Sequence, residues 1–398
     1  MTKSDCHIPF NKPYASGGEL ANIAQALANN HLSGDGLFSA KCHSWLEEKI
    51  NTPRALLTHS GTAALEMAAL LLNINPGDEV IMPSFTFVST ANAFALRGAI
   101  PVFVDIDALT MNIAPSLIEA AITAKTVAIV VVHYAGVSCD MDKIMEIAAH
   151  HKLHVIEDAA HAVLSSYKGR MLGSIGILGA LSFHETKNLS CGEGGAITIN
   201  DPALIERSEV IREKGTNRKQ FFRGMVDKYS WIDIGSSFLP SELEAAFLWA
   251  QMESAATIQE NRLASWNAYD QGFNDLEQQG HIRRPVVPAD CGHNAHLYYL
   301  LVDNLDERKA LQSYMQEAGI DCLPHYVPLH SSAAGRKLGR SSGSLEVTDK
   351  ISDTLLRMPL WVDLPAASID TICQTVTQFF QANSQACSSS AKKLQAVD

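Results

Sequence analysis

One lysine stands between a polar turn and a glycine-rich loop in the stretch Ser-Phe-His-Glu-Thr-Lys-Asn-Leu-Ser-Cys-Gly-Glu-Gly-Gly, residues 182–195. An apolar run ends at Ser182, Lys187 follows in the turn, and Gly192, Gly194 and Gly195 permit close backbone approach or positive φ in the return. A lysine amine held near a carbonyl compound can form a covalent bond with it. Most lysines are solvated surface residues, so Lys187 alone identifies no site.

Two acidic residues and a histidine follow a second apolar run. Glu157 and Asp158 come directly after 154–156, and His161 follows within one turn. Neighbouring side chains of a strand point to opposite faces, so one acid faces the edge where ligands bind. A carboxylate there can hold a cationic ring nitrogen, and His161 can contact the same ring. Asp158 can equally cap the segment that follows it.

A phosphate site and an aromatic ring are indicated at two further strand ends. Ser60, Gly61 and Thr62 precede an Ala- and Leu-rich helical stretch, and small residues at a helix N-terminus can bind phosphate. The same residue types are common helix caps. The segment 83–87 places Phe85 after another strand, where it can stack on a flat ligand or fill the core.

One ligand uses all four features. Pyridoxal phosphate (PLP) has a phosphate, a flat ring, a ring nitrogen whose proton an aspartate maintains, and an aldehyde that a lysine captures. The combination predicts a PLP site at one edge of a sheet, with Lys187 as the covalent anchor.

These residues need a sheet whose strand ends meet at one edge. From about residue 55 to 200, short β-branched runs alternate with helical stretches, and 127–132 is apolar throughout. This pattern predicts a mostly parallel sheet with helices on both faces. The predicted strands are 55–58, 79–82, 101–105, 127–133, 154–157, 179–183 and 195–199, with the last two as a hairpin or antiparallel member. The predicted helices are 62–72, 88–96, 115–123, 140–152 and 202–213.

The C-terminal part has a different pattern. Ser241 and Glu244 form a capping-box sequence at the start of a long helical segment, 243–276, within which we place a domain change. A strand (296–302), a helix (307–318), a Pro- and His-rich loop (324–330) and two more helices predict a small α+β domain. We expect a large domain over 1–250, a small one over 251–380 and a disordered tail over 381–398.

The composition excludes several classes of function. The 398-residue chain carries a formal net charge of -12, which argues against nucleic-acid binding because that needs clustered Lys and Arg. It has neither a leader pattern nor a long apolar run, so we expect a cytoplasmic protein that does not insert into a membrane. Its 8 cysteines lack metal-site spacing, so we expect reduced thiols and no metal.

Four segments, 58–67, 77–87, 157–161 and 182–188, resemble the DegT/DnrJ/StrS family of nucleotide-sugar aminotransferases. The resemblance extends over about residues 8–380. It implies an α/β fold of the aspartate aminotransferase type, with a mostly parallel mixed sheet between helices in the large domain and a small C-terminal α+β domain. It also implies PLP that cycles through pyridoxamine phosphate (PMP), and a homodimer or higher homo-oligomer with the active site at the subunit interface.

The resemblance gives roles to the residues around the ring. Lys187 would bind the cofactor aldehyde, Asp158 would pair with the ring nitrogen, and Phe85 would stack on the ring. His161 would contact the ring oxygen, where many relatives have Gln.

The phosphate would be held by Gly61, Thr62 and Ser182. Relatives complete this site with an Asn of the partner subunit, in a segment that matches 235–239. This sequence has serines there, and we assign the contact to Ser237.

A narrower resemblance concerns the substrate. The segments 132–136, 212–218, 220–224, 226–229 and 233–237 most resemble family members of enterobacterial common antigen synthesis. These transfer the amino group of L-glutamate to dTDP-4-dehydro-6-deoxy-D-glucose, giving dTDP-4-amino-4,6-dideoxy-D-galactose and 2-oxoglutarate.

Four residues are candidates for substrate contacts. Arg218 or Arg223 would neutralise the donor carboxylate or the nucleotide diphosphate, unless each lies in a surface ion pair. His325 and His330 would line the site, unless their Pro-braced loop only fixes the small domain in place.

Three alternatives remain open. The acceptor can be another nucleotide-linked keto sugar, with a different base or amination site. The protein can be a dehydratase of the same fold, although those relatives carry His where this chain has Lys187. It can also be a regulatory or sugar-nucleotide-binding protein without turnover, which the intact Lys187, Asp158 and Ser182 and the absence of a basic face disfavour.

Overall fold

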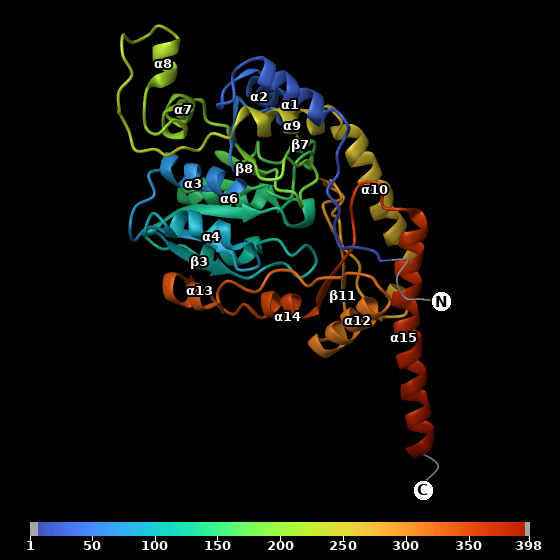
Figure 1. Cartoon of the computed structure of the whole chain (residues 1–398). Helices are drawn as coiled ribbons and strands as arrows, with labels where there is room; N and C mark the ends of the chain where they lie inside the picture. Colours follow the sequence, from blue (N-terminus) through green and yellow to red (C-terminus); the bar gives the residue numbers. More distant parts are fainter. Residues whose placement is uncertain (1–6, 395–398) are drawn as a thin grey trace.

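The computed structural model describes residues 7–394, with side chains described up to residue 382. Within this range an eight-stranded sheet forms the centre of the molecule, in the order β1-β9-β8-β5-β4-β2-β3-β12 (Figure 1). Neighbours from β8 to β12 run parallel, and β9 is antiparallel to both β1 and β8, which confirms the mostly parallel mixed sheet. The strands are β1 Arg54–Thr58, β2 Glu79–Pro83, β3 Ile100–Val104, β4 Thr126–Val132, β5 His154–Asp158, β8 Leu178–Ser182, β9 Gly195–Ile199 and β12 Arg340–Ser341.

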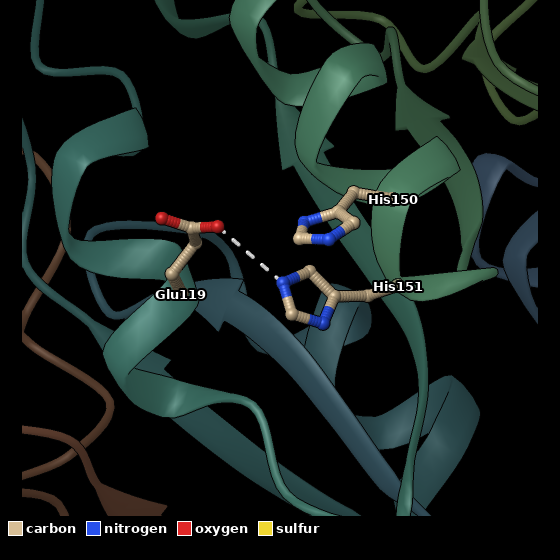
Figure 2. A group of neighbouring side chains, drawn as sticks. All are labelled: Glu119, His150 and His151. Atoms are coloured by element: carbon tan, nitrogen blue, oxygen red, sulfur yellow. Dashed lines mark hydrogen bonds and ion pairs between the residues drawn. The ribbon is translucent and has the colours of Figure 1, made fainter.

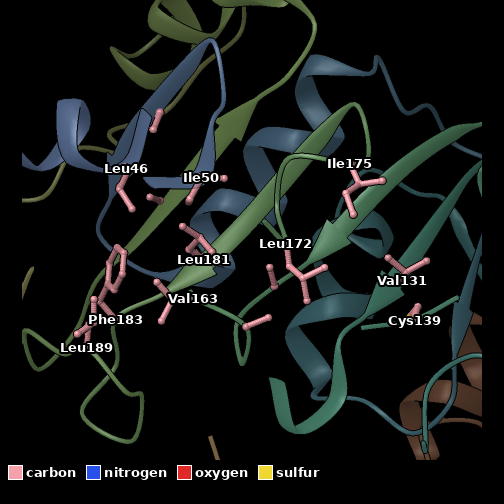
Figure 3. Close-up of a cluster of buried hydrophobic side chains, with 14 of the residues drawn as sticks. Leu46, Ile50, Val131, Cys139, Val163, Leu172, Ile175, Leu181, Phe183 and Leu189 are labelled. Carbon is pink, nitrogen blue, oxygen red and sulfur yellow. The ribbon is translucent and has the colours of Figure 1, made fainter. Parts of the chain in front are cut away.

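Helices cover both faces of the sheet because side chains alternate along its strands. In β4, Ile129 and Val131 belong to the core that also contains residues of α2 and α6, whereas Ala128 and Val130 belong to the core that contains residues of α3 and α4. Figure 3 shows part of the first core, where Leu46 and Ile50 of α2 share a cluster with Leu181 of β8. One face carries α1 Glu19–Ala28, α2 Leu37–Ile50, α5 Ile118–Ala121, α6 Met141–His151 and α9 Glu242–Glu253, and the other carries α3 Gly61–Leu71, α4 Val88–Ala95 and α7 Ile205–Arg212.

Several predicted helices are shorter or broken. Proline starts a 3-10 turn before α5 and before α7, because it fits the first turn but cannot donate a backbone hydrogen bond. The segment 243–276 is divided into α9, α10 Ala255–Gly272 and α11 Asn274–Gln278. The capping box of Ser241 and Glu244 is present at the start of α9.

The small domain is built on an antiparallel pair, β11 Tyr298–Leu301 and β13 Leu355–Met358. Helix α10 links the two cores: Ile258 packs in the large-domain core, and Trp266 and Tyr269 pack in the small one. The other C-terminal helices are α12 Leu305–Glu317, α13 Ala333–Leu338, α14 Glu346–Thr354 and α15 Ala366–Leu394, one more after the loop 324–330 than predicted.

Two segments cross the expected domain boundaries. Ile8 forms a bridge to Ile320 and lies in the small-domain core, although it belongs to the N-terminal segment. Strand β12 joins the large sheet beside β3, and its Arg340 binds Glu79 through two contacts of 3.0 and 2.7 Å. Such long-range pairings leave no local signal in the sequence. For the same reason the sequence does not predict the two-residue strands β6 Ser166–Tyr167, β7 Arg170–Met171 and β10 Cys291–Gly292.

The C-terminal helix α15 extends away from the body (Figure 1) and continues to Leu394, into the segment predicted as a disordered tail. Residues 395–398 lie outside the described residues, as do the side chains from 383 onward, so the tail and the domain limits at 250 and 380 stay predictions. No helix in the described part of the chain has both the length and the apolar character needed to cross a membrane.

Asp105, at the end of β3, fixes the small domain against the sheet. Its carboxylate accepts from Val347 N (3.0 Å), Thr348 N (2.8 Å) and Thr348 Oγ1 (2.7 Å) in the first turn of α14. Asp105 is only 5% exposed, and a negative charge near a helix N-terminus is favourable. One residue of the large domain therefore caps a helix that follows the loop 324–330.

We predict that Asp105→Ala lowers the free energy of unfolding by about 3 kcal/mol, because it leaves buried amides without an acceptor. The matched control is Asp107→Ala, which removes only local turn contacts to Leu109 N and to the backbone N and hydroxyl of Thr110. Urea unfolding of both variants measures the difference. Equal losses would contradict the role of Asp105 between domains.

Candidate active site

A cavity of about 710 Å³ lies at the carboxyl ends of the parallel strands, between the two domains. The large domain contributes residues that end or follow β1, β2, β4, β5 and β8, and the small domain contributes His325, Tyr326 and Arg357. The place agrees with the rule that ligands of open α/β sheets bind beyond the strand ends.

Lys187 lies on the cavity wall, in the loop that connects β8 to β9. Backbone hydrogen bonds continue the hairpin beyond the strands, from Phe183 to Gly194 and from Glu185 to Gly192. The side chain of the next residue, Asn188, is buried and donates to Asn294 O at 2.7 Å. These contacts hold the lysine at the tip of a short, braced loop.

The Lys187 amine has no hydrogen-bond or ion-pair partner within the described residues. Burial lowers its pKa to about 8, the Asp158 charge opposes that shift, and the Arg357 charge adds to it. About a tenth of the amine is therefore neutral, and nucleophilic, at pH 7, far more than for an ordinary lysine.

The two neighbouring acids point to opposite faces, as predicted. Asp158 lines the cavity, where Oδ2 accepts from Thr90 Oγ1 at 2.7 Å and Oδ1 accepts from Ala160 N at 3.2 Å. The contact with Ala160 N is the local cap that the sequence analysis gives as the alternative to a ligand role. Asp158 makes this contact and also faces the cavity. Burial raises its pKa, because two neutral donors do not replace hydration of the charge.

Glu157 points away from the cavity and has a structural role. It is fully buried, accepts from His133 Nε2 (3.0 Å), and also accepts from the backbone N of Gly173, Ile175 and Gly176. Despite its burial, these hydrogen bonds and the His133 ring keep its pKa below the ordinary value. It fixes the segment that leads into β8.

His161 lies beside the cavity in a stack of rings. Its ring centroid is 4.2 Å from that of His296, and Nε2 is 3.1 Å from the Tyr326 hydroxyl. Burial, together with the charges of Lys187 and Arg357, lowers the pKa of His161 well below its ordinary value. Nδ1 is buried without a partner in the described structure, which leaves one hydrogen-bond position open.

The other end of the cavity has the features of a phosphate site. Ser60 caps α3 by accepting from Ala63 N at 3.1 Å, and Thr62 Oγ1 is 2.7 Å from Ser89 Oγ. A Cβ on Gly61 would lie 3.0 Å from Ser182 Cβ, so the absence of a side chain lets this turn approach β8 closely. Ser60, Gly61, Thr62, Ser89 and Ser182 all line the cavity.

Phe85 does not lie where we expected. It is 1% exposed, is absent from the cavity wall, and packs 5.2 Å from the Tyr134 ring and 5.4 Å from the Tyr326 ring. The alternative reading, a core aromatic, is what the structure shows. Phe87, two residues later at the start of α4, lines the cavity and is 58% exposed. Alternation cannot separate these two rings in the sequence, because the chain bends after β2.

The two histidines of the loop 324–330 have different roles: one lines the cavity and the other attaches the loop to the sheet. His325 lines the cavity, and its Nδ1 is 2.8 Å from the Tyr134 hydroxyl. His330 lies outside the cavity wall, with Nδ1 2.8 Å from Ser84 Oγ and its backbone N donating to the same oxygen at 3.0 Å. His330 therefore fixes the loop to the end of β2. This is the role that the sequence analysis gives as the alternative to a substrate contact.

Three other candidates lie outside the cavity of their own chain. Arg218 pairs with Glu213 (3.1 Å) and Arg223 pairs with Glu209 (3.0 Å), which are the ion pairs set against substrate binding. Arg218 begins α8 (Arg218–Phe222) and Arg223 directly follows it, in a segment that projects from the body (Figure 1). Ser237 is exposed and forms an isolated bridge with Glu213.

Arg357 of β13 was missed by the sequence analysis and lines the cavity. A single arginine in a short apolar strand gives no signal of ligand binding. Phe87 was missed for the reason given above, and Tyr326 because aromatic residues in such loops usually pack in cores.

Two groups outside the main site have no assigned chemistry. The six cysteines in the described part are free, as expected, and Cys191 Sγ fills the space beside Gly194, where a Cβ would lie 2.5 Å away. Glu119, His150 and His151 gather at the surface, with His151 Nε2 3.4 Å from Glu119 (Figure 2). Within the described residues, these three side chains make no hydrogen bond or ion pair other than the one between His151 and Glu119. The sequence analysis predicts no metal site, and these residues do not test that prediction.

The residues of the cavity fit PLP. Asp158 is a buried carboxylate that a cationic ring nitrogen would neutralise, and His161 Nδ1 is an unpartnered donor or acceptor beside it. The close approach of Gly61 to Ser182 forms the floor of a small anion site at a helix N-terminus. Lys187 supplies the amine for the aldehyde.

Comparisons with known proteins agree with this site. Over 387 residues the chain is 33% identical to the spore coat polysaccharide biosynthesis protein SpsC of Bacillus subtilis, covering 94% of this chain and 98% of the relative. The structure of this chain is similar to that of DesV of S. venezuelae, solved in complex with a ketimine intermediate. The TM-score is 0.86 at 32% identity, with 94% of this chain and 99% of DesV covered. This chain is also similar to Spr1654 of Streptococcus pneumoniae, described as a sugar aminotransferase, in its PLP form (TM-score 0.87, 25% identity, 95% and 99% covered) and PMP form (TM-score 0.87, 25% identity, 94% and 99% covered).

The model of the DegT/DnrJ/EryC1/StrS aminotransferase family matches residues 14–377, and the chain belongs to this family. The predicted family and fold are thereby confirmed. The protein is a PLP-dependent sugar aminotransferase, and its cofactor cycles between PLP and PMP.

We predict that the cofactor-free protein captures PLP faster as the pH rises, with a midpoint at about 8, because only the neutral Lys187 amine attacks the aldehyde. In Asp158→Asn the midpoint should move to lower pH, because the charge that favours protonated lysine is gone. Rapid-mixing absorbance measures the rate, and Lys49→Ala, at an exposed lysine, is the control. A midpoint that Asp158→Asn leaves unmoved would contradict the coupling.

We also predict that Phe87→Ala weakens PMP binding by roughly 3- to 10-fold through loss of ring stacking, with little change in stability. Phe85→Ala should instead lower the free energy of unfolding by about 3–5 kcal/mol through loss of core packing. Titration with PMP and thermal unfolding separate the two effects. If Phe87→Ala retains full affinity for PMP, Phe87 does not stack on the ring.

Proposed function

We propose that the protein transfers the amino group of L-glutamate to the C4 ketone of dTDP-4-dehydro-6-deoxy-D-glucose, giving dTDP-4-amino-4,6-dideoxy-D-galactose and 2-oxoglutarate. The observation that carries the amino transfer is the partly neutral Lys187 amine facing the same cavity as the buried Asp158 carboxylate. The choice of substrates, and a place in enterobacterial common antigen synthesis, rest on the sequence segments at 132–136 and 212–237.

Bound PLP supplies an electron sink that stabilises the negative charge left when the α-proton of an amino acid departs. The Lys187 amine would take that proton and return it to the bound group. A pKa of about 8 suits both directions, because the amine is neither permanently charged nor permanently neutral. The same residue then serves the reverse sequence with the keto sugar.

The neighbouring residues maintain the charge and the position of the ring. The Asp158 carboxylate would hold a proton at the ring nitrogen, and Thr90 fixes the orientation of that carboxylate through the 2.7 Å hydrogen bond to Oδ2. The helix α3 N-terminus with Ser182 would hold the phosphate, and Phe87 would cover one face of the ring, because all of them line the cavity.

A homodimer belongs to the same proposal. Within the segment 222–234, Phe222 is 69% exposed, Met225 65%, and Trp231 80%. A second copy of the chain is the occupant we propose for this surface, and it would bury these side chains. Ser237, Arg218 and Arg223 can then serve a cavity only across the subunit interface.

A cytoplasmic location also belongs to the proposal, and the free thiols at the six described cysteines fit a reducing compartment. An aminotransferase for a different nucleotide-linked keto sugar remains the main alternative. A dehydratase is disfavoured by Lys187, and a protein without turnover is disfavoured by the intact lysine and aspartate.

The test is incubation of the purified, PLP-loaded protein with L-glutamate and dTDP-4-dehydro-6-deoxy-D-glucose, with the product identified by NMR. The expected result is the 4-amino-4,6-dideoxygalactose nucleotide and one equivalent of 2-oxoglutarate. Lys187→Ala should lose at least roughly 1000-fold in turnover, because both the covalent anchor and the proton carrier are gone.

The UDP-linked and C3-keto analogues are the matched controls for the acceptor. An amino sugar formed from one of these and not from the dTDP C4 ketone would replace the substrate assignment. Formation of PMP from L-glutamate without any of these acceptors reacting would retain the donor and reject the proposed acceptors.

A further inference from the structure

We infer that a second cavity, outside the active site, binds a small zwitterion: an α-amino acid with an apolar side chain. This cavity has a volume of about 460 Å³ and lies where Ala108 of the large domain meets β11 and α14 of the small domain. Small-molecule sites typically have volumes of about 300–1,000 Å³. The second cavity shares no wall residue with the active-site cavity, and the inference does not depend on the proposed substrates.

Buried apolar side chains form one part of the wall. Ile282, Leu301, Val302 and Ile351 line the cavity and are all buried. Leu301 and Ile351 also belong to the core cluster that contains Tyr134. These side chains are therefore held by the packing behind them, and their open side offers a fixed apolar surface to a ligand.

Arg283 contributes a positive charge that has no acidic partner. Its backbone pairs with Leu301 in both directions, at 2.8 and 3.0 Å, and Nη2 donates to Ala108 O. Nε is buried without a hydrogen-bond partner in the described structure, whereas Nη1 has no partner there and is not fully enclosed. A cation that is partly dehydrated and lacks a counter-ion favours a carboxylate at its open side.

Three further charged side chains line the same cavity without pairing. Glu346 and Lys350 lie one turn apart on α14, with the acid before the base, which is the favourable order for an ion pair. Within the described residues neither side chain forms an ion pair or a hydrogen bond, and the same holds for the Asp303 side chain. Charges of both signs are therefore available to a ligand.

The balance of charges favours a zwitterion over a simple ion. A ligand with only a negative charge would meet the repulsion of Asp303 and Glu346, and one with only a positive charge would meet that of Arg283 and Lys350. An α-amino acid has a carboxylate for the two bases and an ammonium for the two acids. Its side chain can then cover the apolar part of the wall, which favours an apolar one.

The test is calorimetric titration of the PMP-loaded protein with L-leucine, because PMP has no aldehyde that could capture the amine. We expect a Kd below about 1 mM. Two analogues retain the branched apolar group: 4-methylpentanoate lacks the ammonium, and 3-methylbutylamine lacks the carboxylate. Each should bind roughly 5-fold more weakly or worse, since one set of charge-assisted contacts is lost.

Variants assign each end of the ligand to its side of the cavity. Arg283→Gln and Lys350→Gln should each weaken binding of L-leucine and 4-methylpentanoate but not of 3-methylbutylamine. Glu346→Gln should weaken L-leucine and 3-methylbutylamine but not 4-methylpentanoate. Lys350 is exposed and its side chain has no partner in the described structure, so Lys350→Gln keeps the test valid even if Arg283→Gln is unstable. Lys309→Gln, at an exposed lysine of α12 outside the cavity, is the matched control and should bind L-leucine as the wild type does.

Each contrary result overturns the inference and leaves the proposed function in place. If L-leucine does not bind, or binds equally to the wild type and to Arg283→Gln, Lys350→Gln and Glu346→Gln, the cavity is not its site. If 4-methylpentanoate binds as tightly as L-leucine, the cavity recognises an anion and the zwitterion is wrong. If 3-methylbutylamine does so, it recognises a cation and the zwitterion is equally wrong.

Discussion

The active site depends on two opposite charges that the fold holds near each other in a partly buried space, the Asp158 carboxylate and the Lys187 amine. Burial disfavours the charged form of each group, raising the pKa of Asp158 and lowering that of Lys187 to about 8. Each charge also opposes the shift of the other. The result is a lysine that can attack, release and carry protons, beside a carboxylate that a cationic ring would complete.

Neighbouring strands of the parallel sheet bring these two groups together. Asp158 ends β5 and Lys187 follows β8, and these strands pair in parallel, so both groups reach the same edge. The reversed strand β9 keeps the lysine loop short, because the chain returns directly beside β8. Glu157, on the opposite face, fixes the segment before β8 through its backbone hydrogen bonds. A structural acid and a functional acid thus stand side by side in the chain.

The small domain supplies the remainder of the site through contacts to the ends of the strands. Asp105 caps α14, and Ser84 binds His330 of the loop that carries His325 and Tyr326, so the small domain is tied to the sheet at two places. Arg357 enters the cavity from the same domain. A change of substrate within this architecture can therefore come from the small-domain face without alteration of the lysine or of the ring-nitrogen acid.

The sequence by itself determined the sheet, most of its strands and several residues that line the cavity, because apolar periodicity and the residues that follow each strand are local signals. It did not determine which of Phe85 and Phe87 faces the cavity, since the backbone turns between them. Nor did it identify Arg357 as a cavity residue. It also did not show that Arg218 and Arg223 form ion pairs, or that His330 fixes its loop to Ser84. Those outcomes depend on contacts between residues far apart in the chain, and only the packing of the small domain against the sheet decided them.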